Sequence, residues 1–197
     1  MISELDRQLS SWRCLLPRQL QWSDDQRWNL SDAAQHLGNH GCAYNADIMM
    51  AELRARFYAA RFTLLSPFLY RALHHPELMS VEDTCHCCSA LQSTFFWPMA
   101  VTPVKDQKRL IPHHFTWTQN AITFLCVFTM IHENNTLKRI CHDHLDLRSL
   151  RSSVALQLCW LEDLERVDGI ARWAWKLLRP LFIRGCIEPV DPKDNER

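Results

Sequence analysis

The stretch HHFTWTQNAITFLCVFTMIH, residues 113–132, decides the fold class of this chain. Its apolar side chains recur at steps of three and four residues, which is the spacing of an α-helical face. Because the pattern is apolar around most of the helix, we predict that this helix lies at the centre of a helical array. Its longest nearly unbroken apolar run, residues 121–131, is well short of the roughly 20 residues that span a bilayer. No membrane association is therefore predicted.

Similar spacing predicts further helices on both sides of this stretch. Pro67 is expected to kink a long helix or to divide it in two, because proline removes a backbone donor. Ser80 is the expected N-cap of the next helix, with Glu82 and Asp83 in its first turn, where the helix dipole favours acids. The predicted helices cover residues 2–16, 47–75, 81–97, 135–144, 147–166 and 170–183.

The remaining segments are polar. Residues 21–46 contain Gly38 and Gly41 and are predicted to form a flexible loop, and residues 185–197 are predicted to form a disordered tail. The chain has only four glycines, which disfavours hairpins, and it shows no alternating strand pattern of useful length. We therefore predict an all-α fold: one domain over residues 1–184, built as an irregular array of six to eight helices without a sheet.

Composition and charge exclude several classes of protein. Of 197 residues, 47% are hydrophobic and 22% are charged, which is typical of a globular domain and not of a disordered chain. Lys+Arg and Asp+Glu both number 22, whereas a free-standing DNA-binding domain is usually basic. The first residues lack a basic segment followed by an apolar run, so we do not expect secretion. The nine cysteines are accordingly expected to be reduced thiols in the nucleus or cytoplasm.

The segment VEDTCHCCSALQS, residues 81–93, concentrates three cysteines and a histidine. Cys85 and Cys88 share a helix face and could supply half of a zinc site, but a structural site needs about four ligands. The other half would have to come from His74/His75, His113/His114 or residues 141–144. We favour core packing of Cys88 with Leu91 and Phe95, since free cysteine is commonly buried. Metal binding and redox sensing are the less favoured alternatives.

Other candidate sites carry weaker signals. The sequence contains no GxGxxG, GxxxxGK[ST], GxSxG or HExxH motif, so we predict no catalytic residue, no cofactor and no metal ligand. Trp173 and Trp175 cannot both face inward on one helix, so one of them is expected at a pocket or a partner surface. The candidate residues for such a pocket or surface are His113, His114, Trp117, Trp173 and Trp175.

Four stretches resemble a known family: residues 5–22, residues 53–100 with RFYAARF and PFLYRALHHPE, residues 108–141 with RLIPHHFTWTQN, and residues 167–182 with VDGIARWAWKLLRPLF. The resemblance is to the C-terminal half of the regulatory, or middle homology, region of fungal Zn2Cys6 zinc-cluster transcription factors. It implies an all-helical domain of a nuclear regulator that tunes transcription, senses small molecules or contacts other factors.

The zinc cluster of that family, C-x2-C-x6-C followed by C-x2-C-x6–8-C, is missing from this sequence, whose one CxxC is Cys85–Cys88. We therefore expect a truncated, non-catalytic regulatory module that binds no specific DNA sequence by itself. Its expected partners are other transcription-factor chains, coregulators or a small apolar effector.

The alternative is a small helical binding protein or enzyme that holds an apolar ligand between its helices. The polar groups of that site would be the His74/His75 and His113/His114 pairs. A closed cavity that contains one of these histidines would favour this alternative.

Overall fold

A computed structural model of the chain describes residues 1–22, 24, 48–97, 114–166 and 168–182. Within these ranges the protein is all-α, as predicted, and no strand is formed. Short 3-10 turns cover Arg18–Leu20 and Pro76–Leu78. The seven α-helices of the described ranges are α1 (Ile2–Cys14), α3 (Ile48–His74), α4 (Val81–Phe96), α5 (His114–Glu133), α6 (Asn135–His144), α7 (Leu147–Leu164) and α8 (Gly169–Leu181).

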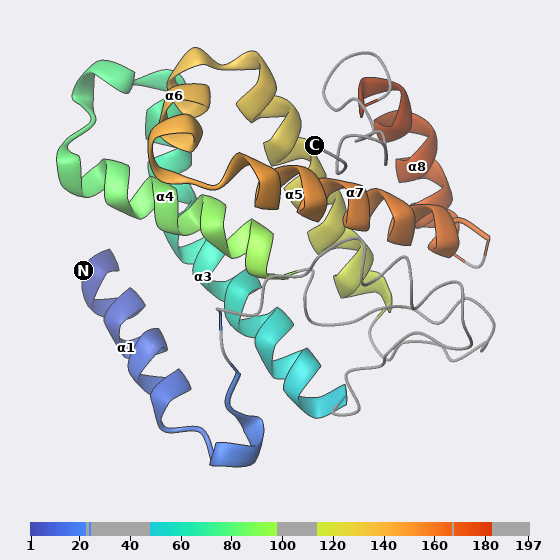
Figure 1. Ribbon diagram of the computed structural model, residues 1–197, viewed down its shortest axis with the longest axis horizontal. Helices are drawn as coiled ribbons and strands as arrows, with labels where there is room; N and C mark the ends of the chain where they lie inside the picture. Colours follow the sequence, from blue (N-terminus) through green and yellow to red (C-terminus); the bar gives the residue numbers. More distant parts are fainter. Residues whose placement is uncertain (23, 25–47, 98–113, 167, 183–197) are drawn as a thin grey trace, which may run out of the picture.

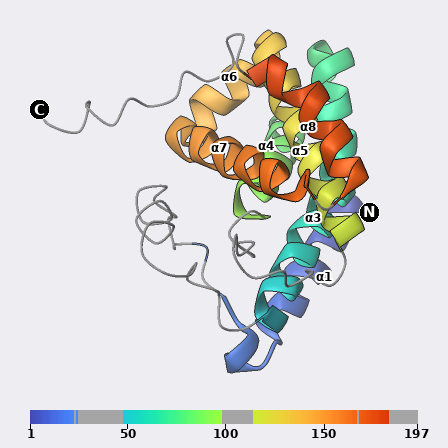
Figure 2. The ribbon, with the colours of Figure 1, turned by 90° about the vertical axis from the view of Figure 1, so that its right-hand side faces the viewer.

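The helices form an irregular array in which α3 and α4 make the most extensive pair (Figure 1). Helix α1 lies alongside α3 at one side of the molecule, and α7 packs against α8 at the other side (Figures 1 and 2). Helix α5 contacts α6, α7 and α8 along its length. Its aromatic side chains also reach α3 and α4, so the predicted central position of this helix is confirmed.

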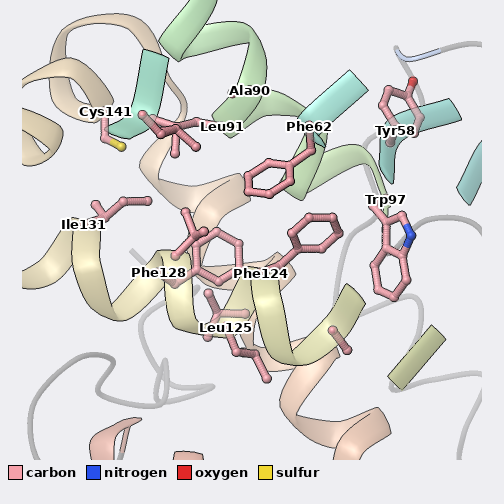
Figure 3. Packing of buried hydrophobic residues seen from close by; sticks show 14 of the residues in the cluster. Tyr58, Phe62, Ala90, Leu91, Trp97, Phe124, Leu125, Phe128, Ile131 and Cys141 are labelled. Carbon is pink, nitrogen blue, oxygen red and sulfur yellow. The ribbon is translucent and has the colours of Figure 1, made fainter. Parts of the chain in front are cut away.

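Phe124 of α5 lies in the buried core among other aromatic rings (Figure 3). Its ring centroid lies 5.0 Å from that of Phe62 on α3 and 5.2 Å from that of Trp97 at the end of α4, both in edge-to-face geometry. One turn further along α5, Phe128 stacks on Phe95 of α4 at 5.9 Å. These aromatic contacts join three helices that are distant in sequence, and such pairs add stability beyond the apolar area they bury.

Helix α1 has no fully buried residue, but its partly buried Ile2 and Leu9 pack against the core, and polar contacts hold the helix there as well. Arg61 of α3 donates two hydrogen bonds to the Asp6 carboxylate, from Nε at 2.8 Å and from Nη2 at 3.1 Å. At the end of α1, Arg13 binds Asp24 through Nη1 at 2.6 Å and the carbonyl oxygen of Trp22 through Nη2 at 2.9 Å. The bidentate contact between Arg61 and the Asp6 carboxylate fixes orientation as well as proximity.

Helix α3 continues through Pro67 and is not divided there. Proline has no N–H to donate to the carbonyl four residues earlier, which here belongs to Thr63. The Ser66 hydroxyl donates to that carbonyl oxygen at 2.9 Å and replaces the missing bond. Helix α8 likewise contains Pro180 near its end and does not stop before it. The predicted loop over residues 21–46 lies outside the described residues except for 21, 22 and 24, and the predicted tail over 185–197 lies wholly outside them.

Helix α4 begins as predicted, with Ser80 as its N-cap. The Ser80 hydroxyl accepts a hydrogen bond from the Asp83 backbone N–H at 3.1 Å, and the Asp83 carboxylate accepts one from the Ser80 N–H at 2.9 Å. Arg71 of α3 donates to the same carboxylate at 2.8 Å. This reciprocal capping box satisfies two backbone donors and fastens the start of α4 to α3.

We expect Ser80→Ala to lower the free energy of unfolding by about 1 kcal/mol, because it removes the side-chain cap of α4. Urea unfolding followed by circular dichroism measures the loss. Ser89→Ala, on the same helix and away from its start, is the matched control and should stay within about 0.5 kcal/mol of wild type. Equal effects of the two substitutions would contradict the capping role.

Acid should weaken the same cap. The backbone N–H of Ser80, the Ser80 hydroxyl and the Arg71 guanidinium hold the pKa of the Asp83 carboxyl below its usual 3.8. The stabilisation by this carboxylate is therefore complete above pH 3.8 and is lost as the pH falls through the lower pKa of the folded state. We expect the melting temperatures of wild type and Asp83→Asn to differ at neutral pH and to converge in strong acid. A constant difference across this range would rule out the carboxylate as the stabilising form.

Candidate functional site

Among the described side chains, the structure does not bring together the residues that we predicted for a pocket or a partner surface. His113 lies outside the described residues. For His114 and Trp117, in the first turn of α5, the structure describes the backbone but not the side chains. Trp173 is 62% exposed on α8, whereas Trp175 is half-buried with the Arg179 guanidinium 5.5 Å from its ring centroid. The two rings do not both face inward, as predicted, and the position of one of them at a pocket or a partner surface stays a prediction.

The His74/His75 pair lies at the surface, at the end of α3. The His74 ring packs on the exposed ring of Tyr70, with centroids 4.3 Å apart. His75 Nδ1 is 3.8 Å from the Glu77 carboxylate, and both side chains are solvated. Both histidines are exposed, so this pair does not supply the polar groups that an enclosed ligand site would need.

The most deeply buried cysteine of the α4 cluster is a different residue from the one we expected. Cys87 is completely buried, Cys88 is only partly buried and Cys85 is exposed. The core-facing row is therefore Cys87, Ala90, Leu91 and Thr94. Two rows of side chains on α4 could face the core, one through Cys87 and one through Cys88. Leu91 lies on both rows, since it follows Cys87 by four positions and Cys88 by three. The placement of α3 and α5 decides which row is buried more deeply. Core packing is confirmed for this segment: Cys88 packs against the core with Leu91 and Phe95, as predicted, but only partly buried, and the completely buried cysteine is Cys87.

His86, in the same segment, contacts α1 and α3. Its Nε2 is 3.1 Å from the Ser3 hydroxyl and 3.6 Å from the Glu82 carboxylate, and its ring packs on Phe68 with centroids 4.6 Å apart. Within the described ranges, no group of three or more His, Cys, Asp or Glu side chains could hold a metal ion. The cysteines at 14, 85, 87, 88, 126 and 141 are free thiols.

Thiol reactivity should separate these cysteines. Burial raises the pKa of Cys87 to about 12 and that of Cys141 to about 12, so neither forms an appreciable amount of thiolate at neutral pH. We expect iodoacetamide to modify exposed Cys14 and Cys85 in the folded protein and to modify Cys87 and Cys141 only after denaturation. Peptide mass spectrometry measures each site, and rapid native labelling of Cys87 would contradict its burial.

An exposed apolar stripe runs along α8. The buried face of helix α8 consists of Ala171, Ala174 and Leu178, which point into the core. A second row, about a quarter turn away, remains 41–62% exposed. This row, the α8 stripe, comprises Ile170, Trp173, Leu177 and Leu181. The apolar arc of the helix is therefore wider than the surface that the core covers.

A pocket of about 360 Å³ opens between α5, α6 and α7, next to the residue that follows α8. Three of its apolar lining residues, Phe128, Ile131 and Cys141, belong to the buried core (Figure 3). Val154 and Phe182 complete the buried part of the wall. The exposed lining residues include His132, Lys138, His142 and Arg151. No sequence motif identified this pocket, because its residues come from four segments that only folding brings together.

Comparisons with known proteins do not assign a family: no protein-family profile, no curated protein and no solved structure matches the chain. The resemblance to fungal zinc-cluster regulators therefore stays a prediction from the sequence stretches quoted above. Among the described helices, none combines the length and the apolar character needed to cross a membrane.

Proposed function

We propose that this chain is a non-catalytic transcription-regulatory module that acts in the nucleus by binding another protein chain. The observation that carries the proposal is the α8 stripe, in which an exposed tryptophan is flanked by Ile170, Leu177 and Leu181 on a helix anchored in the core. The nuclear and transcriptional part of the proposal rests on the resemblance to the C-terminal half of the fungal zinc-cluster regulatory region.

The α8 stripe has the chemistry of a protein-binding surface. Contiguous exposed apolar patches mark interaction sites more often than isolated apolar residues do. Tryptophan is enriched among the residues that dominate binding energy at interfaces, where it fills pockets on the partner. Because Ala171, Ala174 and Leu178 hold the adjacent face of α8 in the core, the stripe is presented on a rigid element.

The charge of the chain supports action through a protein partner. DNA-binding domains gain much of their affinity because an excess of basic residues neutralises DNA phosphates. This chain has a formal net charge of zero and therefore lacks such an excess. The expected partners are full-length transcription factors or coregulators that carry the DNA contact themselves.

Tethering tests the proposal directly. The full chain is fused to a heterologous DNA-binding domain in a fungal host, and transcription from a matching reporter is compared with that from the DNA-binding domain alone. We expect the fusion to change reporter output and the double variant Trp173→Ala/Leu177→Ala to lose most of that change. Both side chains are exposed, so the double variant should fold, which the melting temperature of the purified protein verifies.

Lys176→Ala is the matched control, because Lys176 is exposed on the polar side of the same helix. This variant should retain the full reporter response at equal protein abundance. The proposal fails if the fusion leaves transcription unchanged or if the double variant behaves like wild type. Tight, sequence-selective binding of duplex DNA by the purified chain would also contradict it.

A second candidate function, binding of a small apolar ligand between helices, is favoured by the pocket between α5, α6 and α7. His132 and His142 line the pocket, whereas the predicted His74/His75 pair does not, and the side chains of the predicted His113/His114 pair lie outside the described part of the chain.

A further inference from the structure

We infer that the pocket between α5, α6 and α7 binds an apolar molecule that carries a single anionic head group, such as a medium-chain fatty acid. This inference rests on the second candidate function, ligand binding between helices, and is independent of the α8 stripe. Three properties of the pocket carry it: its size, its apolar interior and the sign of the charges around its mouth.

The size and the interior fit a small apolar body. A volume of about 360 Å³ lies within the range of about 300–1,000 Å³ that is usual for small-molecule sites. The deep wall is formed by Phe128, Ile131, Cys141, Val154 and Phe182, each no more than 5% exposed. The Cys141 thiol stays protonated because burial raises its pKa, so this wall carries no negative charge.

The mouth of the pocket is cationic. Lys138 extends from α6 and Arg151 from α7, so two positive charges approach the opening from different helices. Neither forms an ion pair with a carboxylate of the described residues, whereas His142 already contacts Asp143 at 3.1 Å. None of the described lining residues is acidic, although the chain as a whole has equal numbers of acidic and basic residues. An anionic head group would therefore meet favourable charge at the mouth, and a cationic one would not.

The pairing of apolar wall and cationic mouth selects an amphipathic anion over a neutral or zwitterionic ligand. The apolar body gains affinity by leaving water, at about fourfold for each methylene that is buried. The head group stays at the mouth, where Lys138 and Arg151 can reach it without leaving solvent, so no buried charge is created.

Titration calorimetry with the full chain tests the inference. The probes are octanoate and decanoate as carboxylates, octyl phosphate as a phosphate, and 1-octanol as the neutral analogue, all below micelle-forming concentrations. We expect saturable one-to-one binding of at least one anionic probe. Octanol should bind at least tenfold more weakly, and decanoate more tightly than octanoate. The ratio of octanoate to octyl phosphate affinity tells whether the natural head group is a carboxylate or a phosphate.

Variants locate the binding. Lys138→Ala/Arg151→Ala should weaken binding of the anion at least tenfold and leave octanol binding unchanged, since both side chains are exposed and lie outside the apolar wall. Lys176→Ala, which removes an exposed charge on α8 outside the lining, is the control and should bind like wild type.

The absence of saturable anion binding by the wild-type chain would overturn the inference. Equal anion affinity of the double variant and wild type would overturn it as well. Failure here and failure of partner recruitment are distinguishable, because the reporter assay depends on Trp173 and Leu177 and the titration depends on Lys138 and Arg151.

Discussion

Phe124→Ala is expected to lower the free energy of unfolding by about 3–5 kcal/mol. Phe124 is 1% exposed, and its ring meets Phe62 of α3 and Trp97 of α4 at centroid distances of 5.0 and 5.2 Å. The substitution removes a ring that three helices share and leaves a cavity that the surrounding helices can close only in part. Because domains of this size are stable by about 5–15 kcal/mol, the loss is a large fraction of the total.

Urea unfolding followed by circular dichroism measures this loss. Thr123→Ala, at the neighbouring exposed position of α5, is the matched control and should change stability by no more than about 0.5 kcal/mol. If Phe124→Ala unfolds the chain completely, Phe124→Leu keeps part of the packing and should give an intermediate loss. A Phe124→Ala protein within 1 kcal/mol of wild type would mean that α5 is not the centre of the core.

Tyr58→Phe is expected to cost about 1–3 kcal/mol, although it removes a single oxygen atom. The buried Tyr58 hydroxyl accepts a hydrogen bond from Trp22 Nε1 at 3.2 Å and donates one to the Asp24 carboxylate. Burial raises the pKa of this phenol above its usual value, and the bond to Asp24 raises it further, so it remains a donor. Without the hydroxyl, the Trp22 N–H stays buried without that acceptor, and Asp24 keeps its contact with Arg13 at 2.6 Å.

The control for this change lies on the same helix. Tyr70 is 60% exposed, so Tyr70→Phe should leave stability within about 0.5 kcal/mol of wild type. Urea unfolding of both variants at equal protein concentration makes the comparison. Equal effects of the two substitutions would show that the hydroxyl of Tyr58 does not anchor Trp22 and Asp24 to α3.

The helices and their starts were predictable because they depend on local chemistry. The apolar periodicity of residues 113–132 predicted α5 and its central position, and Ser80 predicted the start of α4. Each of these features depends on residues within a few positions of one another. Hydrophobic spacing and capping groups act over that same range, so a reader of the sequence could see both cause and effect.

The continuity of α3 was harder to predict, although its cause is also local. Pro67 indicated a kink or a division, yet the Ser66 hydroxyl compensates for the missing N–H by binding the Thr63 carbonyl. The signal was present as a serine directly before the proline. Its effect depends on the side-chain rotamer, which spacing alone does not reveal.

The candidate sites depended on tertiary structure. Cys87 is completely buried and Cys88 only partly, because the placement of α3 and α5 favours the first of two rows that both pass through Leu91. The nominated histidine pair His74/His75 faces solvent. The cationic mouth combines Lys138 with Arg151, which lie on different helices and show no shared motif.

By itself, the sequence predicted the all-α fold and the starts of the helices. It also predicted that Trp173 and Trp175 cannot both face inward. These follow from periodicity and capping, which are properties of single helices. Only the tertiary structure decided that Trp173 is the exposed one, which cysteine is buried and where an apolar pocket meets two positive charges. Burial and cavities arise from the packing of one helix against another, and no single helix contains that information.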